Sequence, residues 1–121
     1  MATSMATMTL DGLLGRVREL EPLIREHAPR GGRERRLAQP VSDALRDAGF
    51  FRIFRPASRG DGLELDSVTA FHVFEELSRI DSAVGWNLTL ANACELFGAW
   101  YSDRVTEEVF GSPETVMAGS W

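Results

Sequence analysis

Residues 75–88 read EELSRIDSAVGWNL, and this stretch decides how the chain folds. Asp81 and Ser82 are both residue types that cap the start of a helix, so the stretch predicts the end of one helix and the start of the next. Glu95 is the only charged residue from Ala83 to Tyr101. The second of these helices is therefore apolar nearly all the way round, which is typical of a helix that other parts of a protein surround.

The sequence on either side of this stretch also predicts helices. Apolar residues at steps of three and four predict a first helix from Leu10, which Pro22 should kink and Pro29 with Gly31–Gly32 should end. Each of the remaining helices is expected to begin after a proline or a capping residue: Val41–Ala48 after Pro40, with Gly49 as its left-handed cap; Ser67–Ile80 after Asp66; and a short helix between Ser102 and Gly111.

Length and composition are those of one ordinary globular domain. The chain has 121 residues, of which 44% are hydrophobic and 26% charged, and its net charge of −5 argues against a nucleic-acid binder. A single cysteine, Cys94, excludes an internal disulfide framework and favours a reducing compartment, the cytoplasm. Asn87, Asn92 and Glu95 interrupt the apolar run, which argues against a membrane span.

Two features indicate that this chain is the N-terminal part of something larger. A helix that is apolar around its circumference needs more protein to surround it than 121 residues supply. Thr115–Ala118 has the composition of a β-strand, but the sequence offers it no second strand. The alternative is a compact bundle whose fourth helix is simply central.

Five motifs occur in order along the chain: VSDALRDAGFFRIFRP (41–56), GDGLELD (60–66), FEELSRIDSAVGW (74–86), TEEVFG (106–111) and VMAGSW (116–121). Together they resemble the N-terminal helical domain of the acyl-CoA dehydrogenase superfamily. The likeness is greater to its flavin-dependent monooxygenase branch, the two-component hydroxylases, in which a Trp follows the SRIDSAVG-like stretch as Trp86 does here. The resemblance covers about Leu10 to Trp121 and is a distributed pattern rather than one sharp motif.

The resemblance implies an all-α domain of about five helices. Superfamily members add a middle β-domain and a C-terminal four-helix bundle, and the flavin lies mainly between those two. Residues 1–9 are then expected to be a disordered N-terminus, residues 10–114 the helical domain, and residues 115–121 the first strand of a middle β-domain, cut short. FAD or FMN is implied for the full-length parent, and none is expected on this chain alone.

The resemblance also implies a function for the parent protein: oxidation of an acyl-CoA thioester, or flavin-dependent hydroxylation of a small, aromatic substrate. This domain would form a wall of the substrate cavity together with the middle and C-terminal domains. It would also support assembly of a homo-oligomer. The catalytic Glu of acyl-CoA dehydrogenases lies in the C-terminal domain, so no catalytic residue is assigned here and the chain alone is expected to be inactive. The alternative is a stand-alone helical interaction module, without catalysis, that dimerises through residues 83–101.

Six residues are candidates for the substrate cavity or the flavin side: Trp86, Asn87, Leu90, Cys94, Ser120 and Trp121. Trp86 and Leu90 share a helical stripe with Ala93 and Phe97, for which core packing competes with a cavity wall. Trp86 lies on the most apolar helix and is expected to be buried. Amide side chains such as those of Asn87 and Asn92 need partners if buried, and the neighbouring backbone is favoured over a substrate.

Two positions depart from the family pattern. Arg59 stands where family members usually have an aromatic residue before the third helix, and Cys94 stands where hydroxylases commonly have a His, eight residues after the Trp. A reactive thiolate would need a base or a positive charge nearby, whereas Glu95 has the wrong sign, so Cys94 is expected to be a small buried hydrophobe. His27 and His72 lack metal-ligand spacing, and no metal site is expected.

Overall fold

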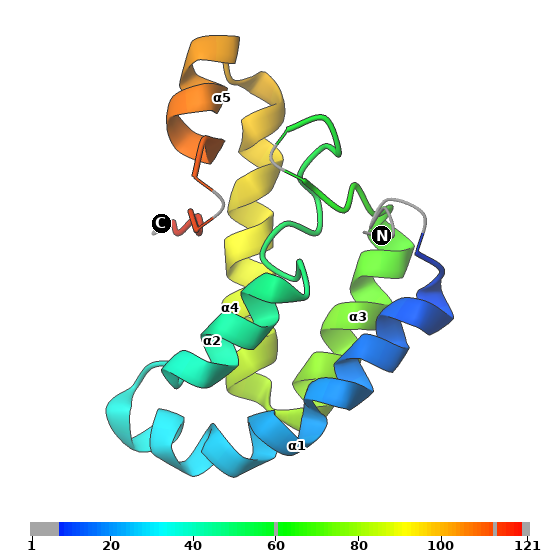
Figure 1. The fold of residues 1–121 in the computed structure, drawn as a ribbon, viewed down its shortest axis with the longest axis vertical. Helices are drawn as coiled ribbons and strands as arrows, with labels where there is room; N and C mark the ends of the chain where they lie inside the picture. The colour runs from blue at the N-terminus through cyan, green and yellow to red at the C-terminus, as the bar shows by residue number, and fades with distance from the viewer. Residues whose placement is uncertain (1–7, 60, 113, 120–121) are drawn as a thin grey trace.

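Helices are the only regular secondary structure in the residues that the computed structural model describes, which are 8–59, 61–112 and 114–119. Five α-helices and one 3-10 helix follow one another along the chain: α1 (Leu10–Glu34), α2 (Gln39–Asp47), α3 (Ser67–Ile80), α4 (Ser82–Glu95), the 3-10 helix η2 (Leu96–Trp100) and α5 (Asp103–Phe110) (Figure 1). The predicted all-α fold class is confirmed. Residues 1–7, with most of the segment expected to be disordered, lie outside the described residues.

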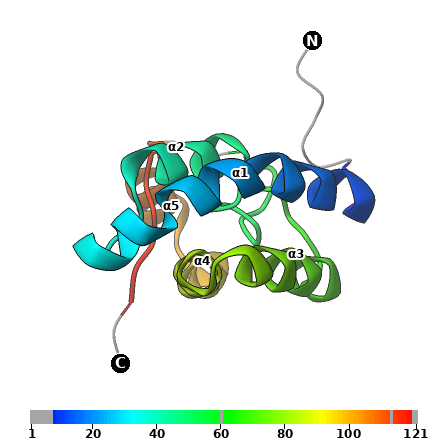
Figure 2. The same ribbon diagram turned by 90° about the horizontal axis from the view of Figure 1, so that it is seen from below.

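The helices pack in two layers around one core. Figure 2 shows α1 and α2 in one layer and the antiparallel pair α3 and α4 in the other, and Figure 1 shows α5 beyond the C-terminal end of α4. Side chains from both layers meet between them and are almost completely buried: Leu13, Val17, Ile24, Val41, Leu45, Ala70, Val73, Leu77, Val84, Leu88 and Ala91. No helix in the described part of the chain is long and apolar enough to cross a membrane.

The end of α1 differs from the expectation. Pro22 and Pro29 both lie inside the helix, which continues to Glu34 and bends between its two halves (Figure 1). The two prolines are seven residues apart and exposed, so both face water, which can bind the carbonyl groups that a proline leaves unpaired. Arg35 ends the helix instead, with a left-handed backbone (φ 55°) and an N–H group that donates to the carbonyl of Gly31.

The other helix boundaries agree with the capping residues in the sequence. The Asp66 carboxylate accepts the backbone N–H groups of Val68 and Thr69, both at 3.0 Å, at the start of α3. Of the two residues considered for the start of α4, Asp81 is the cap, and its carboxylate accepts the N–H of Ala83 at 2.9 Å. These bonds satisfy backbone donors that the first turn of a helix leaves free.

The strand expected at Thr115–Ala118 is not formed. Residues 115–119 have no regular secondary structure, because a strand needs a second strand to pair with its backbone and the described residues supply none. That these residues begin a middle β-domain stays a prediction.

The segment between α2 and α3 folds back on itself and enters the core. Gly49 takes a positive φ of 85° after α2, as the left-handed cap requires. Backbone N–H groups of Leu63 and Leu65 then donate to the carbonyls of Arg52 and Ile53 at 2.8 and 2.9 Å. These bonds hold residues 52–55 beside residues 63–65, and they place Arg55 in the interior next to α4.

The two helices of the α3–α4 hairpin approach each other most closely at Gly85. A Cβ atom at this position would lie 1.8 Å from Oγ of Ser78 and 2.8 Å from its Cα atom. Only glycine therefore fits, and the contact sets Ser78 of α3 level with Gly85 of α4. It also decides which side of α4 faces inward.

Substituting alanine for two glycines within helices should give effects of opposite sign. Gly85→Ala is expected to destabilise the fold by about 1–3 kcal/mol, because the helices must separate to admit the methyl group. Gly15→Ala, in α1, meets nothing within 4 Å and should stabilise it by about 0.5–1 kcal/mol through helix propensity. Urea unfolding followed by circular dichroism measures both, and stabilisation by Gly85→Ala would show that the hairpin is not packed this closely.

Candidate functional site

The face of α4 that points away from the core is also apolar. Val84 and Leu88 face the core and are almost completely buried, whereas Trp86 is 66% exposed and Phe97, in η2, is 50% exposed. Leu90 and Ala93, on the same stripe, are half-buried. The expected burial of Trp86 is therefore wrong within this chain. Core packing is therefore wrong for Trp86 and Phe97 within this chain, and for the half-buried Leu90 and Ala93 both interpretations stay open.

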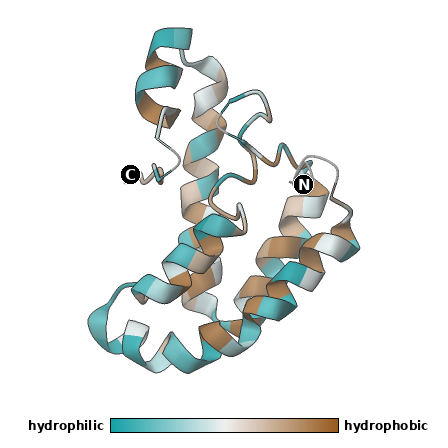
Figure 3. Cartoon of the chain, in the orientation of Figure 1, coloured by the Kyte–Doolittle hydropathy of each residue, from teal (hydrophilic) through white to brown (hydrophobic). Residues whose placement is uncertain are grey.

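Helix α3 also exposes large apolar side chains. Val68 is 69% exposed and Phe71 is 71% exposed. Phe71 lies seven residues, about two helical turns, before Ser78, the residue of α3 that contacts Gly85 of α4. Figure 3 shows apolar residues on both helices. We call the following set the outer apolar face: Val68, Phe71, Trp86, Leu90, Ala93, Phe97 and Trp100.

A cavity of about 320 Å³ opens beside one end of the outer apolar face. It lies where the last turns of α1, the loop to α2 and the first turns of α4 meet. Its lining includes Ile24, His27, Arg35, Arg36, Leu37, Val41, Asp81, Val84, Trp86 and Asn87. Two of the predicted site residues, Trp86 and Asn87, are thus together at this cavity, and Leu90 and Cys94 are not part of its lining.

The two asparagines of α4 have different surroundings. Asn92 is fully buried: its Oδ1 accepts the N–H of Ile53, and its Nδ2 donates to the carbonyls of Phe50 and Leu88, each at 2.8 Å. Asn87 is exposed and donates to the carbonyl of Ala83, one turn earlier in its own helix, at 2.8 Å. Both amides bond to neighbouring backbone, as expected, and Asn92 fastens α4 to the segment that follows α2.

A buried ion pair, which the sequence analysis missed, lies at the C-terminal end of α4. Arg55 donates to both carboxylate oxygens of Glu95, from Nε at 2.9 Å and from a terminal nitrogen at 2.5 Å, and both side chains are fully buried. The guanidinium carbon lies 4.4 Å from the centre of the Phe110 ring, in cation–π geometry. One signal was available: a lone charge in an apolar helix needs a buried partner of opposite sign.

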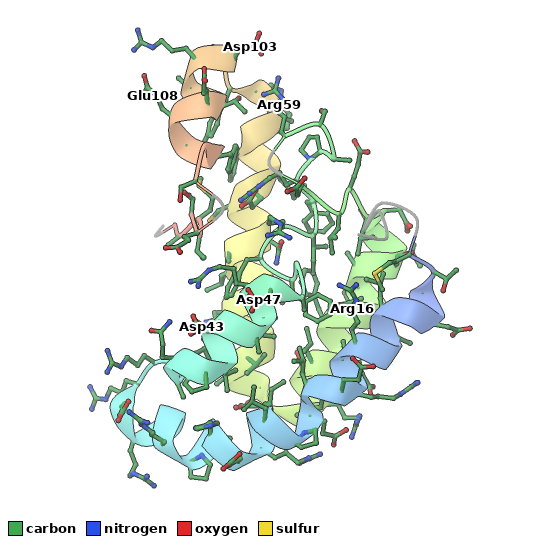
Figure 4. All side chains as sticks on the ribbon, viewed as in Figure 1. Arg16, Asp43, Asp47, Arg59, Asp103 and Glu108 are labelled. Atoms are coloured by element: carbon green, nitrogen blue, oxygen red, sulfur yellow. The ribbon has the colours of Figure 1, made fainter. Side chains whose placement is uncertain are left out.

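Arg59 fastens the same segment to α5. Its guanidinium donates to the Thr106 hydroxyl at 2.5 Å and to the Asp103 carboxylate at 3.2 Å. Arg59 and Asp103 lie together at the end of the molecule that α5 forms (Figure 4). The residue that departs from the family pattern therefore has a structural role here.

Cys94 is buried, as predicted for a small hydrophobe, with 8% of its surface exposed. A Cβ atom on Gly119 would lie 2.9 Å from its Sγ, so the C-terminal segment passes directly over the thiol. Cys94 is eight residues, or about 12 Å of helix rise, from Trp86. Ser120 and Trp121 lie outside the described residues. Within the described ranges, no three His, Cys, Asp or Glu side chains gather to form a metal site.

Comparison with known proteins finds proteins named monooxygenases, among them flavin-dependent ones. The chain is 29% identical over 120 residues to the oxygenase subunit HsaA of Mycobacterium tuberculosis (strain H37Rv), covering 98% of the chain and 30% of that protein. The HsaA of Rhodococcus jostii is 27% identical over 105 residues, and the indole-3-acetate monooxygenase of Pseudomonas putida 29% over 87 residues; these cover 87% and 72% of the chain and 27% and 22% of the relatives. No protein-family model matches. The chain spans less than a third of the length of these relatives.

Proposed function

We propose that this chain is the N-terminal helical part of a flavin-dependent monooxygenase, and that its outer apolar face forms one wall of the substrate cavity. The observation that carries the proposal is that α4 and η2, in a chain similar to named monooxygenases, expose the large apolar side chains of Trp86, Phe97 and Trp100. An apolar surface gathered on one face marks a place that a ligand or another part of a protein covers. The other walls would come from a middle β-domain and a C-terminal bundle.

The described residues fit one side of such a cavity. The outer apolar face presents the rings of Phe71, Trp86 and Phe97, against which a flat substrate or the edge of a flavin ring system can pack. A flavin, FAD or FMN, would supply the activation of oxygen when bound, and this chain would exclude water and orient the substrate. We assign the remaining contacts of the flavin to protein beyond this chain.

Hydroxylation of a small aromatic compound is the reaction that we favour over oxidation of an acyl-CoA thioester. All three relatives compared are named monooxygenases, and one of them is named for the aromatic compound indole-3-acetate. The name "oxygenase subunit" also supports a two-component system in which a second protein delivers reduced flavin, and we propose that the parent protein is a homo-oligomer. No catalytic residue is assigned to this chain.

The reaction is tested in the longer protein that carries this chain. Supplied with reduced flavin, oxygen and a panel of phenols and indoles, it should form products that contain one added oxygen atom, detected by mass spectrometry. Acyl-CoA oxidation with an electron acceptor and without hydroxylation would identify the dehydrogenase reaction instead. If the gene ended at Trp121 and the chain formed a stable dimer through residues 83–101, the stand-alone interaction module would be correct.

Truncating the outer apolar face should weaken substrate use without unfolding the protein. Trp86→Ala and Phe97→Ala in the longer protein are each expected to lower kcat/KM about tenfold, chiefly through KM, because loss of an aromatic contact removes roughly 1.5 kcal/mol of apolar burial. The control is Arg104→Ala in α5, whose side chain is 85% exposed and pairs with Glu108 of its own helix. If the wild-type protein and the three variants had the same kcat/KM, the outer apolar face would not be part of the substrate cavity.

A further inference from the structure

The cavity beside Trp86 has an apolar floor and a basic rim. Ile24, Val41 and Val84 form the floor and are at most 4% exposed. Arg35 and Arg36, which are exposed to solvent, also line the cavity, and so does Trp86, a member of the outer apolar face. A volume of about 320 Å³ is at the lower end of the range for small-molecule sites.

The backbone holds the two arginines at the opening. Arg35 has a positive φ of 55°, and the N–H groups of both Arg35 and Arg36 turn back to the carbonyl of Gly31, the latter at 3.3 Å. A Cβ on Gly31 would lie 3.0 Å from the Arg36 carbonyl oxygen, so the loop is packed tightly against the last turn of α1. A left-handed conformation is unfavourable for a non-glycine residue, so surrounding contacts must maintain it.

The charge around the opening is positive although the whole chain is acidic. Among the described residues that line the cavity, Asp81 is the one acid, and its carboxylate already accepts the N–H of Ala83 as the cap of α4. Glu34, next to the rim, bonds to Arg30 at 3.0 Å and lies 3.6 Å from Arg36. The Arg30 hydrogen bond, with a smaller contribution from Arg36, holds the pKa of Glu34 below its ordinary value.

The rim has a simpler explanation, because basic side chains near the end of a helix also stabilise its negative dipole. That effect accounts for Arg33 in the last turn of α1. It does not account for two further arginines at the opening of a cavity that also has an aromatic border. Arg35 forms no ion pair with another described residue within 4 Å, so its guanidinium is available to a ligand.

We propose that this cavity binds a small organic anion with a flat apolar body. The carboxylate of such a compound would pair with Arg35 and Arg36, since the planar guanidinium group matches carboxylate geometry. Its body would pack on Trp86 and on the floor formed by Ile24, Val41 and Val84. The site uses residues of this chain alone, and the inference does not rest on the proposed monooxygenase function.

The test compares benzoate with benzamide, which has the same shape and no charge. Calorimetric titration of the purified chain should show saturable binding of benzoate and binding of benzamide at least tenfold weaker. The variant Arg35→Ala/Arg36→Ala should lose benzoate binding. The matched control Arg33→Ala/Arg104→Ala removes the same charge elsewhere and should retain it, and Trp86→Ala should weaken benzoate and benzamide alike.

Several results would overturn the proposal. Equal affinity for benzamide, or equal loss of binding in the matched control, would show that the rim makes no specific contact with a carboxylate. If inorganic phosphate bound as tightly as benzoate and displaced it, the arginines would bind any small anion. The apolar floor would then contribute nothing to the affinity. A helical circular-dichroism spectrum of each variant, and repetition in the longer protein, exclude unfolding as the cause of any loss.

Discussion

Replacing Arg55 with Met should destabilise the fold by about 3–5 kcal/mol, because the carboxylate of Glu95 would remain buried without its partner. Both side chains are fully buried, so water cannot replace the lost bonds. Domains of this size are stable by roughly 5–15 kcal/mol, and the loss would be a large share of the total. Guanidinium chloride unfolding followed by circular dichroism measures it.

Two further variants isolate the ion pair. Arg52→Met, three residues earlier, breaks only an exposed bond to the carbonyl of Asp61 and should change stability by less than about 1 kcal/mol. The double variant Arg55→Met/Glu95→Met leaves no unpaired charge and should be more stable than Arg55→Met alone, since an apolar pair can replace a buried ion pair at little cost. An Arg55→Met protein as stable as the Arg52→Met control would mean that Glu95 is reached by water.

Replacing Asn92 with Leu should cost about 2–5 kcal/mol, although the side chains are similar in size. The change leaves the N–H of Ile53 and the carbonyl of Phe50 buried without partners, and each such group costs about 1–3 kcal/mol. Unfolding in urea gives the free energy. The change should also loosen the segment after α2, which hydrogen exchange of the Ile53 amide would detect as faster exchange.

Asn87→Leu is the matched control for this prediction. Asn87 lies five residues earlier in the same helix, and its amide donates to the exposed carbonyl of Ala83. The change should therefore alter the free energy of unfolding by no more than about 0.5 kcal/mol. Similar losses for the two variants would show that the amide of Asn92 contributes no more than helix propensity does.

Local signals in the sequence predicted most of the helix boundaries. The caps at Asp66 and Ser102 and the left-handed Gly49 are each determined by bonds within a few residues, so they can be identified without the fold. The predicted end of α1 was wrong because the helix continues past Pro22 and Pro29. Both prolines face water, which can bind the carbonyl groups that a proline leaves unpaired, so the helix continues past them.

The candidate site was harder to predict, because it depends on contacts between distant parts of the chain. Trp86 was recognised as a site candidate, but its exposure was not, since both sides of α4 are apolar and periodicity cannot tell which side packs. The Gly85–Ser78 contact decides that question in the structure. Arg55 and Glu95 are 40 residues apart, and the cavity joins α1, a loop and α4, so neither follows from spacing along the sequence.

The two sides of α4 differ in how strongly the fold constrains which residues can stand there. Its inner side is constrained by the hydrogen bonds of Asn92, the ion pair of Glu95 and the close contact at Gly85. Few substitutions on that side are therefore compatible with folding. Trp86, on its other side, is 66% exposed within this chain. Mutations on the outer side can therefore accumulate and be selected for new ligands or new neighbours, while the inner side preserves the scaffold that presents them.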